Sequence, residues 1–377
     1  MMQFQPLHGG QVRQIADRFG IPAPELLDFS ANINPDGPPA AVSSTLREAL
    51  NEPSILTNYP DLDEMELKQS LARYAGVQPE NVAVANGFVP LLDAALRTLP
   101  VRRCLVPVPA FVEYRRALER SRVEMVPHIL TADSDFSCNT DLFGGSYDAI
   151  LLANPQNPSG ILASRDTLLR IAGDAAERKI YLLLDEAFID YCPAASLARE
   201  IDRFPTLIVF RSVTKFFGMP GLRIAYAVAN AKTVGQVSQK IAPWPITTLA
   251  SLAAGAAVQN AAFVRRTIAL NRERRSQLQR SIEQLGVHVY RSAANFLLLR
   301  LPETVNCQEF WERLIREHYI VLRNCANYEA LSDQHLRAAV RSDAENDRLV
   351  EALAQLLSFN IGEEDGQNTW PLHVRKS

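Results

Sequence analysis

The segment that indicates the fold most clearly is Ser212-Val-Thr-Lys-Phe-Phe-Gly-Met-Pro-Gly-Leu-Arg223. It follows the apolar run Thr206-Leu-Ile-Val-Phe210 and places Lys215 between hydroxyl side chains and two phenylalanines. Only six of the 39 basic residues are lysines, so a lysine in such apolar surroundings is not expected to be surface filler. Burial disfavours the charged form of an amine and lowers its pKa, which turns a lysine into a nucleophile.

The neighbours of Lys215 indicate which ligand such a nucleophile would meet. A lysine at the end of a strand can simply extend its charged head into water. The hydroxyls of Ser212 and Thr214 and the guanidinium of Arg223 argue for another use, because together they suit a phosphate group. A nucleophilic amine beside a phosphate site predicts the chemistry of pyridoxal 5'-phosphate.

Length and composition restrict the class of protein. A chain of 377 residues predicts two domains, and a net charge of −3 gives no reason to expect a nucleic acid or an anionic membrane as partner. The five cysteines are scattered, with no C-x-x-C pair, so neither a disulfide framework nor a metal site is expected. The N-terminus has charges where a signal peptide needs an apolar stretch, and no membrane-length apolar run occurs. We expect a cytoplasmic protein.

Apolar runs of strand length alternate with helical patterns from about residue 62 onward. Such runs predict an α/β fold with a mostly parallel sheet covered on both faces. After a long charged helix near 264–285, the pattern changes to that of a smaller α+β domain. We predict an N-terminal arm (1–40), a large cofactor-binding domain (41–263), a small C-terminal domain (264–360) and a polar tail (361–377). The strand-length runs are 82–85, 104–106, 149–153, 180–184 and 207–210, then 287–290, 296–300, 320–322 and 336–340.

Polar residues stand at the ends of three of these runs. Asn154 follows one predicted strand, Asp185 ends the next, and Ser212 follows a third. Because ligands of doubly wound sheets bind at the carboxyl ends of the strands, these positions predict the site. Asp185 can cap a turn, or it can keep the pyridine nitrogen of the cofactor protonated. Asn157 can belong to a mere connector, or its amide can face the phenolic oxygen of the cofactor.

Two further signals are weaker when taken alone. Asn86-Gly87 opens a helix directly after a strand, and free N–H groups at a helix start attract anions. Phe111 and Tyr114 can stack on a pyridine ring or fill the core. We expect Phe111 to be the stacking residue.

With these residues taken together, the chain resembles fold-type I pyridoxal phosphate enzymes and, among them, the L-threonine O-phosphate decarboxylases of cobalamin biosynthesis. Four motifs typical of the fold occur in order: Asn154-Pro-Gln-Asn-Pro-Ser-Gly160, Asp185-Glu-Ala-Phe188, Ser212-Val-Thr-Lys215 and Pro220-Gly-Leu-Arg223. The motifs typical of the decarboxylases are His8-Gly-Gly10, Leu27-Asp-Phe-Ser-Ala-Asn-Ile-Asn-Pro35, Tyr59-Pro-Asp61, Arg323-Asn-Cys-Ala-Asn-Tyr328 and Ala338-Ala-Val-Arg341 with Glu345-Asn346. The resemblance covers about residues 7–357.

The resemblance implies a role for each matching residue. Lys215 would bind the cofactor covalently and move the proton at the substrate α-carbon, while Asp185 and Asn157 would face the pyridine nitrogen and the phenolic oxygen. The cofactor phosphate would be held by Ser212, Thr214, Arg223 and the turn at Gly87, Phe88 and Val89. Tyr59 would reach the phosphate in the neighbouring subunit, which implies a homodimer. Arg341 would receive the substrate carboxylate, and His8, Asn32 and Arg323 would surround the substrate phosphate. Gly9 and Asn157 would also bind the substrate.

Two positions depart from the usual pattern. The turn at 86–90 reads Asn-Gly-Phe-Val-Pro, where the family has small or polar residues and a glutamate, and Pro90 has no N–H to donate. Phe188 stands where many aminotransferases of this fold carry a tyrosine, which agrees with the decarboxylase branch.

The fold alone does not choose the reaction. The leading interpretation is decarboxylation of L-threonine O-phosphate, favoured by the motif at 27–35. The alternative is a histidinol-phosphate-type aminotransferase, which shares the fold and a phosphate site. A third interpretation, the ligand-binding module of a transcription regulator, would need a DNA-binding domain and a basic surface.

Overall fold

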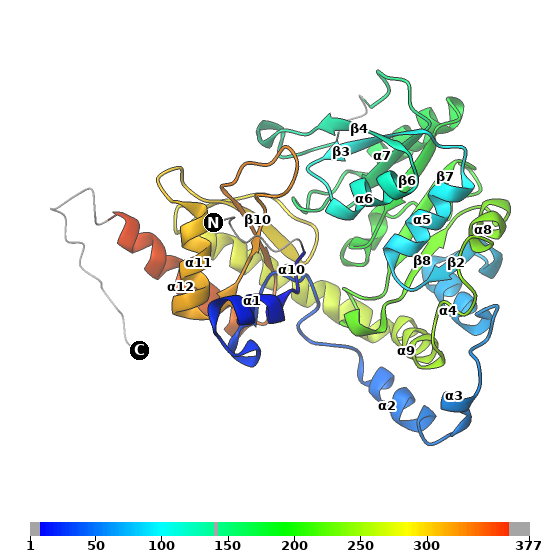
Figure 1. Ribbon diagram of the computed structural model, residues 1–377, viewed down its shortest axis with the longest axis horizontal. Helices are drawn as coiled ribbons and strands as arrows, with labels where there is room; N and C mark the ends of the chain where they lie inside the picture. The colour runs from blue at the N-terminus through cyan, green and yellow to red at the C-terminus, as the bar shows by residue number, and fades with distance from the viewer. Residues whose placement is uncertain (1–7, 139–141, 362–377) are drawn as a thin grey trace.

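The computed structural model describes residues 8–138 and 142–361, and its largest sheet has seven strands, which lie on the right in Figure 1. The strand order is β2-β8-β7-β6-β5-β3-β4. β8 runs antiparallel to β2 and β7, and the other neighbours are parallel. This confirms the predicted α/β fold. The strands are β2 (Val82–Ala85), β3 (Arg103–Val108), β4 (Glu124–Ile129), β5 (Ala149–Ala153), β6 (Tyr181–Asp185), β7 (Leu207–Ser212) and β8 (Ala225–Val228).

Helices cover both faces of this sheet, which is why its central strands are apolar throughout. In β6, Leu182 and Leu184 pack on one side and Leu183 packs on the other. The first face is covered by α2 (Ala40–Ala49), α4 (Met65–Ala75), α7 (Arg165–Glu177) and α9 (Thr248–Val258). The second is covered by α5 (Phe88–Thr98), α6 (Val112–Arg120) and α8 (Ala231–Ser238). The short helix α3 (Ser54–Thr57) follows α2.

A second core forms around an antiparallel sheet in the order β12-β13-β10-β9. Its strands are β9 (His288–Val289), β10 (Phe296–Arg300), β12 (Arg323–Asn324) and β13 (His335–Ala339). The long helix α10 (Ala261–Glu283) packs on β9, β10 and α12, and it also contacts the turn at 189–191 below the large sheet. The helices α11 (Cys307–His318) and α12 (Asp343–Ile361) complete the layer.

The N-terminal segment is built into this second core. Helix α1 (Val12–Phe19) lies beside α11 and α12 in Figure 1, and Ile15 and Phe29 are fully buried there. Strand β1 (Leu27–Asp28) pairs in parallel with β11 (Ile320–Val321). Strand β1 was not among the strands predicted from the sequence. A two-residue strand is too short to show a period of two.

The sequence prediction also missed β4 and β8. β4 reads Glu-Met-Val-Pro-His-Ile and is the edge strand, where polar residues and proline are tolerated. The predicted strand 320–322 corresponds to β11 (Ile320–Val321), and β12 (Arg323–Asn324), which directly follows it in another sheet, was not predicted. The domain boundaries stay a prediction, and the predicted tail from residue 362 lies outside the described residues. Across the described chain, no helix has the length and apolarity needed to span a membrane.

Candidate active site

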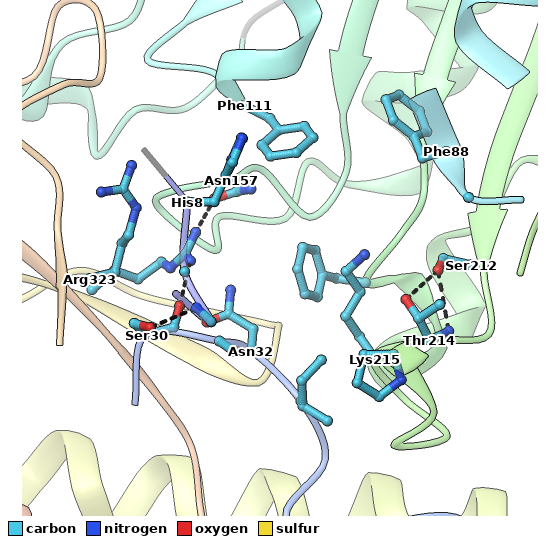
Figure 2. Close-up of a pocket in the computed structure, with 18 of the residues that line it drawn as sticks. His8, Ser30, Asn32, Phe88, Phe111, Asn157, Ser212, Thr214, Lys215 and Arg323 are labelled. Carbon is cyan, nitrogen blue, oxygen red and sulfur yellow. Dashed lines mark hydrogen bonds between the residues drawn. The ribbon is translucent and has the colours of Figure 1, made fainter. Parts of the chain in front are cut away.

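A cavity of about 590 Å³ lies at the carboxyl ends of the parallel strands and is lined from both cores (Figure 2). Figure 2 shows Ser212, Thr214 and Lys215 on one side, with His8, Asn32 and Arg323 on the other. Of the residues predicted from the sequence, the lining contains His8, Gly9, Asn32, Gly87, Phe88, Val89, Phe111, Asn157, Ser212, Thr214, Lys215, Arg223 and Arg323. Chain segments more than 300 residues apart therefore meet in one site.

Lys215 follows β7 and its side chain enters the cavity. Burial lowers the pKa of its amine, the charges of Arg223 and Arg337 lower it further, and the carboxylate of Asp185 opposes them. Its Nζ lies 5.9 Å from the ring centre of Phe188, so an aromatic face replaces water on that side. The backbone N–H of Asn34 donates to the carbonyl of Lys215 at 3.0 Å and fixes the loop. The arrangement favours the neutral, nucleophilic form of the amine.

Asp185 ends β6 behind the cavity wall, held by two donors. The hydroxyl of Tyr114 donates to its Oδ2 at 2.6 Å, and the backbone N–H of Ala187 donates to its Oδ1 at 2.9 Å. Burial raises the pKa of Asp185, while these bonds and the charge of Lys215 favour the ionised form. Tyr114 therefore bonds to Asp185 and is not among the lining residues, whereas Phe111 lines the cavity as predicted. A buried carboxylate of this kind suits a cationic ring nitrogen as its partner.

A cradle for an anion forms where the start of α5 meets the turn after β7. Gly87 has a φ of 96° as the N-cap of α5, and a Cβ on it would lie 2.6 Å from a guanidinium nitrogen of Arg223. The hydroxyls of Ser212 and Thr214 are 2.7 Å apart. The first N–H groups of a helix have no partner within it, so those of Phe88 and Val89 remain as donors, and Pro90 removes none that the helix would use. The residues present fit the phosphate group of pyridoxal 5'-phosphate.

The opposite end of the cavity carries the substrate-side groups. The Oδ1 of Asn32 and the Nε of Arg337 are buried with no hydrogen-bond partner. The guanidinium of Arg323 donates to Asn327 Oδ1 at 2.7 Å and lies 5.3 Å from the ring centre of Tyr328. Arg337 donates to Asn157 Oδ1 and, at 3.2 Å, to the carbonyl of Ser30. The unpaired Nε of Arg337, in the same cavity as Arg323, indicates a site prepared for an anionic ligand, whereas the unpaired Oδ1 of Asn32 can only accept a hydrogen bond.

The segment His8-Gly-Gly10 lies against Ser30 at this end. A Cβ on Gly9 would overlap the carbonyl oxygen of Ser30, so only glycine permits the approach. The N–H of Gly10 donates to the Oγ of Ser30 at 2.9 Å. These contacts hold His8 over the cavity, where its ring lies 6.1 Å from that of Phe111.

Arg341, predicted to receive the substrate carboxylate, is not among the residues that line the cavity, whereas Arg337 is. Arg341 donates to the carbonyl of Asp28 at 3.0 Å and to Glu345 Oε1 at 2.6 Å. It lies beyond the end of β13, whereas Arg337 stands inside that strand and lines the cavity. A buried arginine in the middle of an apolar strand was the signal that could have found it.

Tyr59 lies outside this cavity. It is 80% exposed, and its ring stacks on that of Trp244 at 4.7 Å. Its predicted role in a neighbouring subunit stays a prediction. Among the lining residues that the sequence interpretation did not assign are Asp28, Ser30, Phe188, Tyr328 and Arg337. Within the described ranges, no three His, Cys, Asp or Glu residues gather as a metal site would require.

Comparison with known proteins supplies independent findings. The sequence model of the family "Aminotransferase class I and II" matches residues 24–353. The threonine-phosphate decarboxylase of Salmonella typhimurium is 35% identical over 95% of this chain and 98% of its own length. The crystal structure of L-threonine-O-3-phosphate decarboxylase from Porphyromonas gingivalis superimposes with a TM-score of 0.79 at 25% identity, covering 88% of this chain and 99% of that one. Histidinol-phosphate aminotransferase from Clostridium acetobutylicum gives a TM-score of 0.83 at 26% identity, over 89% and 100%.

Proposed function

The chain belongs to the class I and II aminotransferase family, whose enzymes depend on pyridoxal 5'-phosphate, and from that membership we propose its reaction. The proposal is decarboxylation of L-threonine O-3-phosphate to (R)-1-aminopropan-2-ol O-2-phosphate, as a step of cobalamin biosynthesis. The observation that carries it is the group of His8, Asn32, Arg323 and Arg337 facing Lys215 across one cavity. Two arginines and a histidine suit a substrate with two separate anionic groups.

The cofactor would lie between the cradle and Asp185. Ser212, Thr214, Arg223 and the start of α5 would hold its phosphate, Phe111 its ring face, and Asn157 its phenolic oxygen. The side-chain oxygen of Asn157 already accepts from Arg337, so its amide N–H₂ remains to donate. When bound, the cofactor supplies the electron sink that accepts the electron pair of the broken bond.

The chain's own residues would orient the substrate. Arg337 would receive the carboxylate, and His8, Asn32 and Arg323 the phosphate. An arginine that bound the carboxylate equally well before and during bond breaking would not speed the reaction. The phosphate is therefore the main anchor in this proposal, and Arg337 sets the direction of the carboxylate. Loss of carbon dioxide leaves the α-carbon short of a proton, and the amine of Lys215 is placed to deliver it there.

Histidinol-phosphate aminotransferase is the second candidate, because the similarity to such enzymes is close in structure. Both candidates bring a phosphate to the same cavity. Phe188 favours the decarboxylase, since it leaves no hydroxyl beside Lys215 at this position. The homodimer, the role of Tyr59 in it and the cytoplasmic location stay predictions.

A comparison of two substrates tests the proposal. The cofactor-loaded protein is given either L-threonine O-3-phosphate alone or L-histidinol phosphate with 2-oxoglutarate, and kcat/KM is measured for each. We expect aminopropanol phosphate from the first and little glutamate from the second. Turnover confined to the second would leave the family and the cofactor site intact and reject the decarboxylase.

A further inference from the structure

Glu113 lies next to the end of the cavity proposed for the substrate phosphate, but it is not one of the lining residues. It occupies the first turn of α6, two residues after Phe111, and its side chain is only 14% exposed. Its Oε1 lies 3.1 Å from His8 Nε2 and 3.1 Å from a guanidinium nitrogen of Arg116. Its Oε2 lies 3.9 Å from Arg120, which itself pairs with Asp93. Of the three basic side chains that contact Glu113, only His8 lines the cavity.

The contact connects the two halves of the cavity wall. His8 belongs to the N-terminal segment that is anchored on Ser30, and its backbone N–H donates to Gln11 Oε1 at 2.7 Å. Glu113 belongs to a helix on the large sheet. The N-terminal segment thus fixes the backbone of His8 and Glu113 holds its Nε2, and the residue lines the same cavity as Arg323.

Several charged groups act on His8. Burial lowers the pKa of its imidazole most, and Arg323 and Arg116 lower it as well. Glu113 acts in the opposite direction, through both its charge and its hydrogen bond. His8 is therefore mostly neutral at neutral pH before a ligand arrives, and an incoming dianion would raise its proton affinity.

We propose that Glu113 is a positioning residue for the substrate phosphate: it orients His8 and supplies the negative charge that allows His8 to take up a proton when the phosphate binds. The proton comes from solvent and remains on the imidazole as long as the phosphate is bound. This inference rests on the proposed function only in assuming that a phosphorylated substrate enters this cavity. It makes Glu113, a carboxylate, part of the recognition of an anion.

The substitution Glu113→Gln separates charge from shape, because the amide oxygen can still accept from His8 Nε2. Glu119→Gln is the matched control, since Glu119 is exposed on the same helix and loses the same charge. KM for L-threonine O-3-phosphate is measured from pH 6.5 to 8.5. This range lies above the second pKa of a phosphate ester, about 6, so the substrate phosphate stays largely dianionic. Wild type and the control should lose affinity as the pH rises and His8 loses its proton.

In Glu113→Gln we expect KM to rise about 3- to 10-fold at pH 7, because one unit of pKa is a tenfold change in proton affinity. The pH at which affinity falls should also move downward, and kcat should change little. A purely structural role would raise KM equally at every pH. A Glu113→Gln profile parallel to that of wild type would overturn the proposal.

Calorimetry with sulfate tests the proton uptake without turnover. Sulfate stays dianionic over this range, and the cofactor phosphate of the loaded enzyme blocks the cradle. Titrations in two buffers of different ionisation enthalpy should show net proton uptake by wild type and less by Glu113→Gln. Absence of uptake by wild type would reject the inference. Because this measurement needs no decarboxylation, it can succeed where the proposed reaction fails, and the reverse also holds.

Discussion

At the scale of single residues, the position of a polar group at a strand end proved informative. Ser212 and Asp185 are the last residues of β7 and β6, and Lys215 enters the cavity from the turn that follows β7. Such positions can be predicted because the carboxyl ends of parallel strands share one edge of the sheet. Arg337 could not be told from Arg341 in this way. Arg337 lies four residues earlier, in the middle of the apolar strand β13 rather than beyond its end, and it lines the cavity.

Replacing the buried lysine tests its assignment. In Lys215→Ala the amine that would bind the cofactor is gone, so we expect the purified protein to lose the visible absorbance of the bound cofactor and all activity. The thermal unfolding midpoint should stay near that of the cofactor-free wild type, because the change removes a buried amine whose charged form is disfavoured. Lys232→Ala, at an exposed lysine, is the control. Retained visible absorbance in Lys215→Ala would refute the assignment.

The two arginines Arg323 and Arg341 should respond differently to truncation. Arg323→Ala removes charge-assisted bonds of about 1.5–3 kcal/mol, so KM for the phosphorylated substrate should rise ~10- to 100-fold, with little effect on binding of plain L-threonine. Arg341→Ala should leave KM nearly unchanged. It should instead lower the free energy of unfolding by about 1–2 kcal/mol, because Glu345 and the Asp28 carbonyl lose a donor. Steady-state kinetics measure KM for both variants, and urea unfolding measures their stability. If Arg323→Ala weakened binding of phosphorylated and plain L-threonine equally, Arg323 would not bind the phosphate.

At the scale of helices and strands, continuous apolar runs predicted the central strands because these are buried on both faces. β1 is too short for a period to show, and β4 is an edge strand containing proline. The prediction also missed β8, although it is a buried apolar run of four residues like β2. The Asn-Gly signal for the start of α5 was correct, since Gly87 is its N-cap. The close approach of Arg223 that demands this glycine comes from 136 residues further along the chain and has no local signature.

A buried carboxyl group at the start of α4 should make the free energy of unfolding depend on pH. Burial raises the pKa of Glu64 from 4.5 to about 7, Asp61 adds to the shift, and its Oε1 has no partner. The folded state thus favours the protonated carboxyl, so its contribution to stability is complete below about pH 4.5 and is lost as the pH rises through 7. Glu64→Gln should therefore match wild type near pH 4.5 and be more stable by about 1–2 kcal/mol at pH 8.

Unfolding at pH 5 and pH 8 measures this difference. Glu66→Gln, an exposed carboxylate on the same helix, is the control and should behave as wild type at both pH values. A stability difference between Glu64→Gln and wild type that stays constant with pH would show that burial of this carboxyl does not drive it.

At the scale of the whole molecule, the cavity exists only because two cores close around it. Residues near both ends of the chain, such as His8 and Arg337, meet beside Lys215. No periodicity in the sequence reports such a meeting. The resemblance in the motif at 27–35 placed Asn32 there, but the packing of β1 on β11, which fixes that segment, became visible only in the structure.

Exposed apolar side chains surround Tyr59, the residue predicted to reach the neighbouring subunit of a homodimer. Tyr59 is 80% exposed and Leu56 72% exposed, and Trp244 stacks beside Tyr59. Sedimentation should give twice the 41.9 kDa mass of one chain. Tyr59→Phe should preserve the dimer and weaken cofactor binding by about 3- to 10-fold through one lost hydrogen bond. Tyr319→Phe, at another exposed tyrosine, is the control. Unchanged cofactor affinity in Tyr59→Phe would mean that this hydroxyl does not reach a phosphate.

The fate of the substrate carboxyl carbon tests the central claim most directly. L-Threonine O-3-phosphate labelled with ¹³C at the carboxyl is incubated with the cofactor-loaded protein in the absence of any oxo acid, and labelled carbon dioxide is measured against substrate consumed. If the protein is a decarboxylase, we expect one labelled carbon dioxide and one aminopropanol phosphate for each substrate molecule, over many turnovers. A label that stays in the amino acid, or a reaction that proceeds only when 2-oxoglutarate is added, would contradict it.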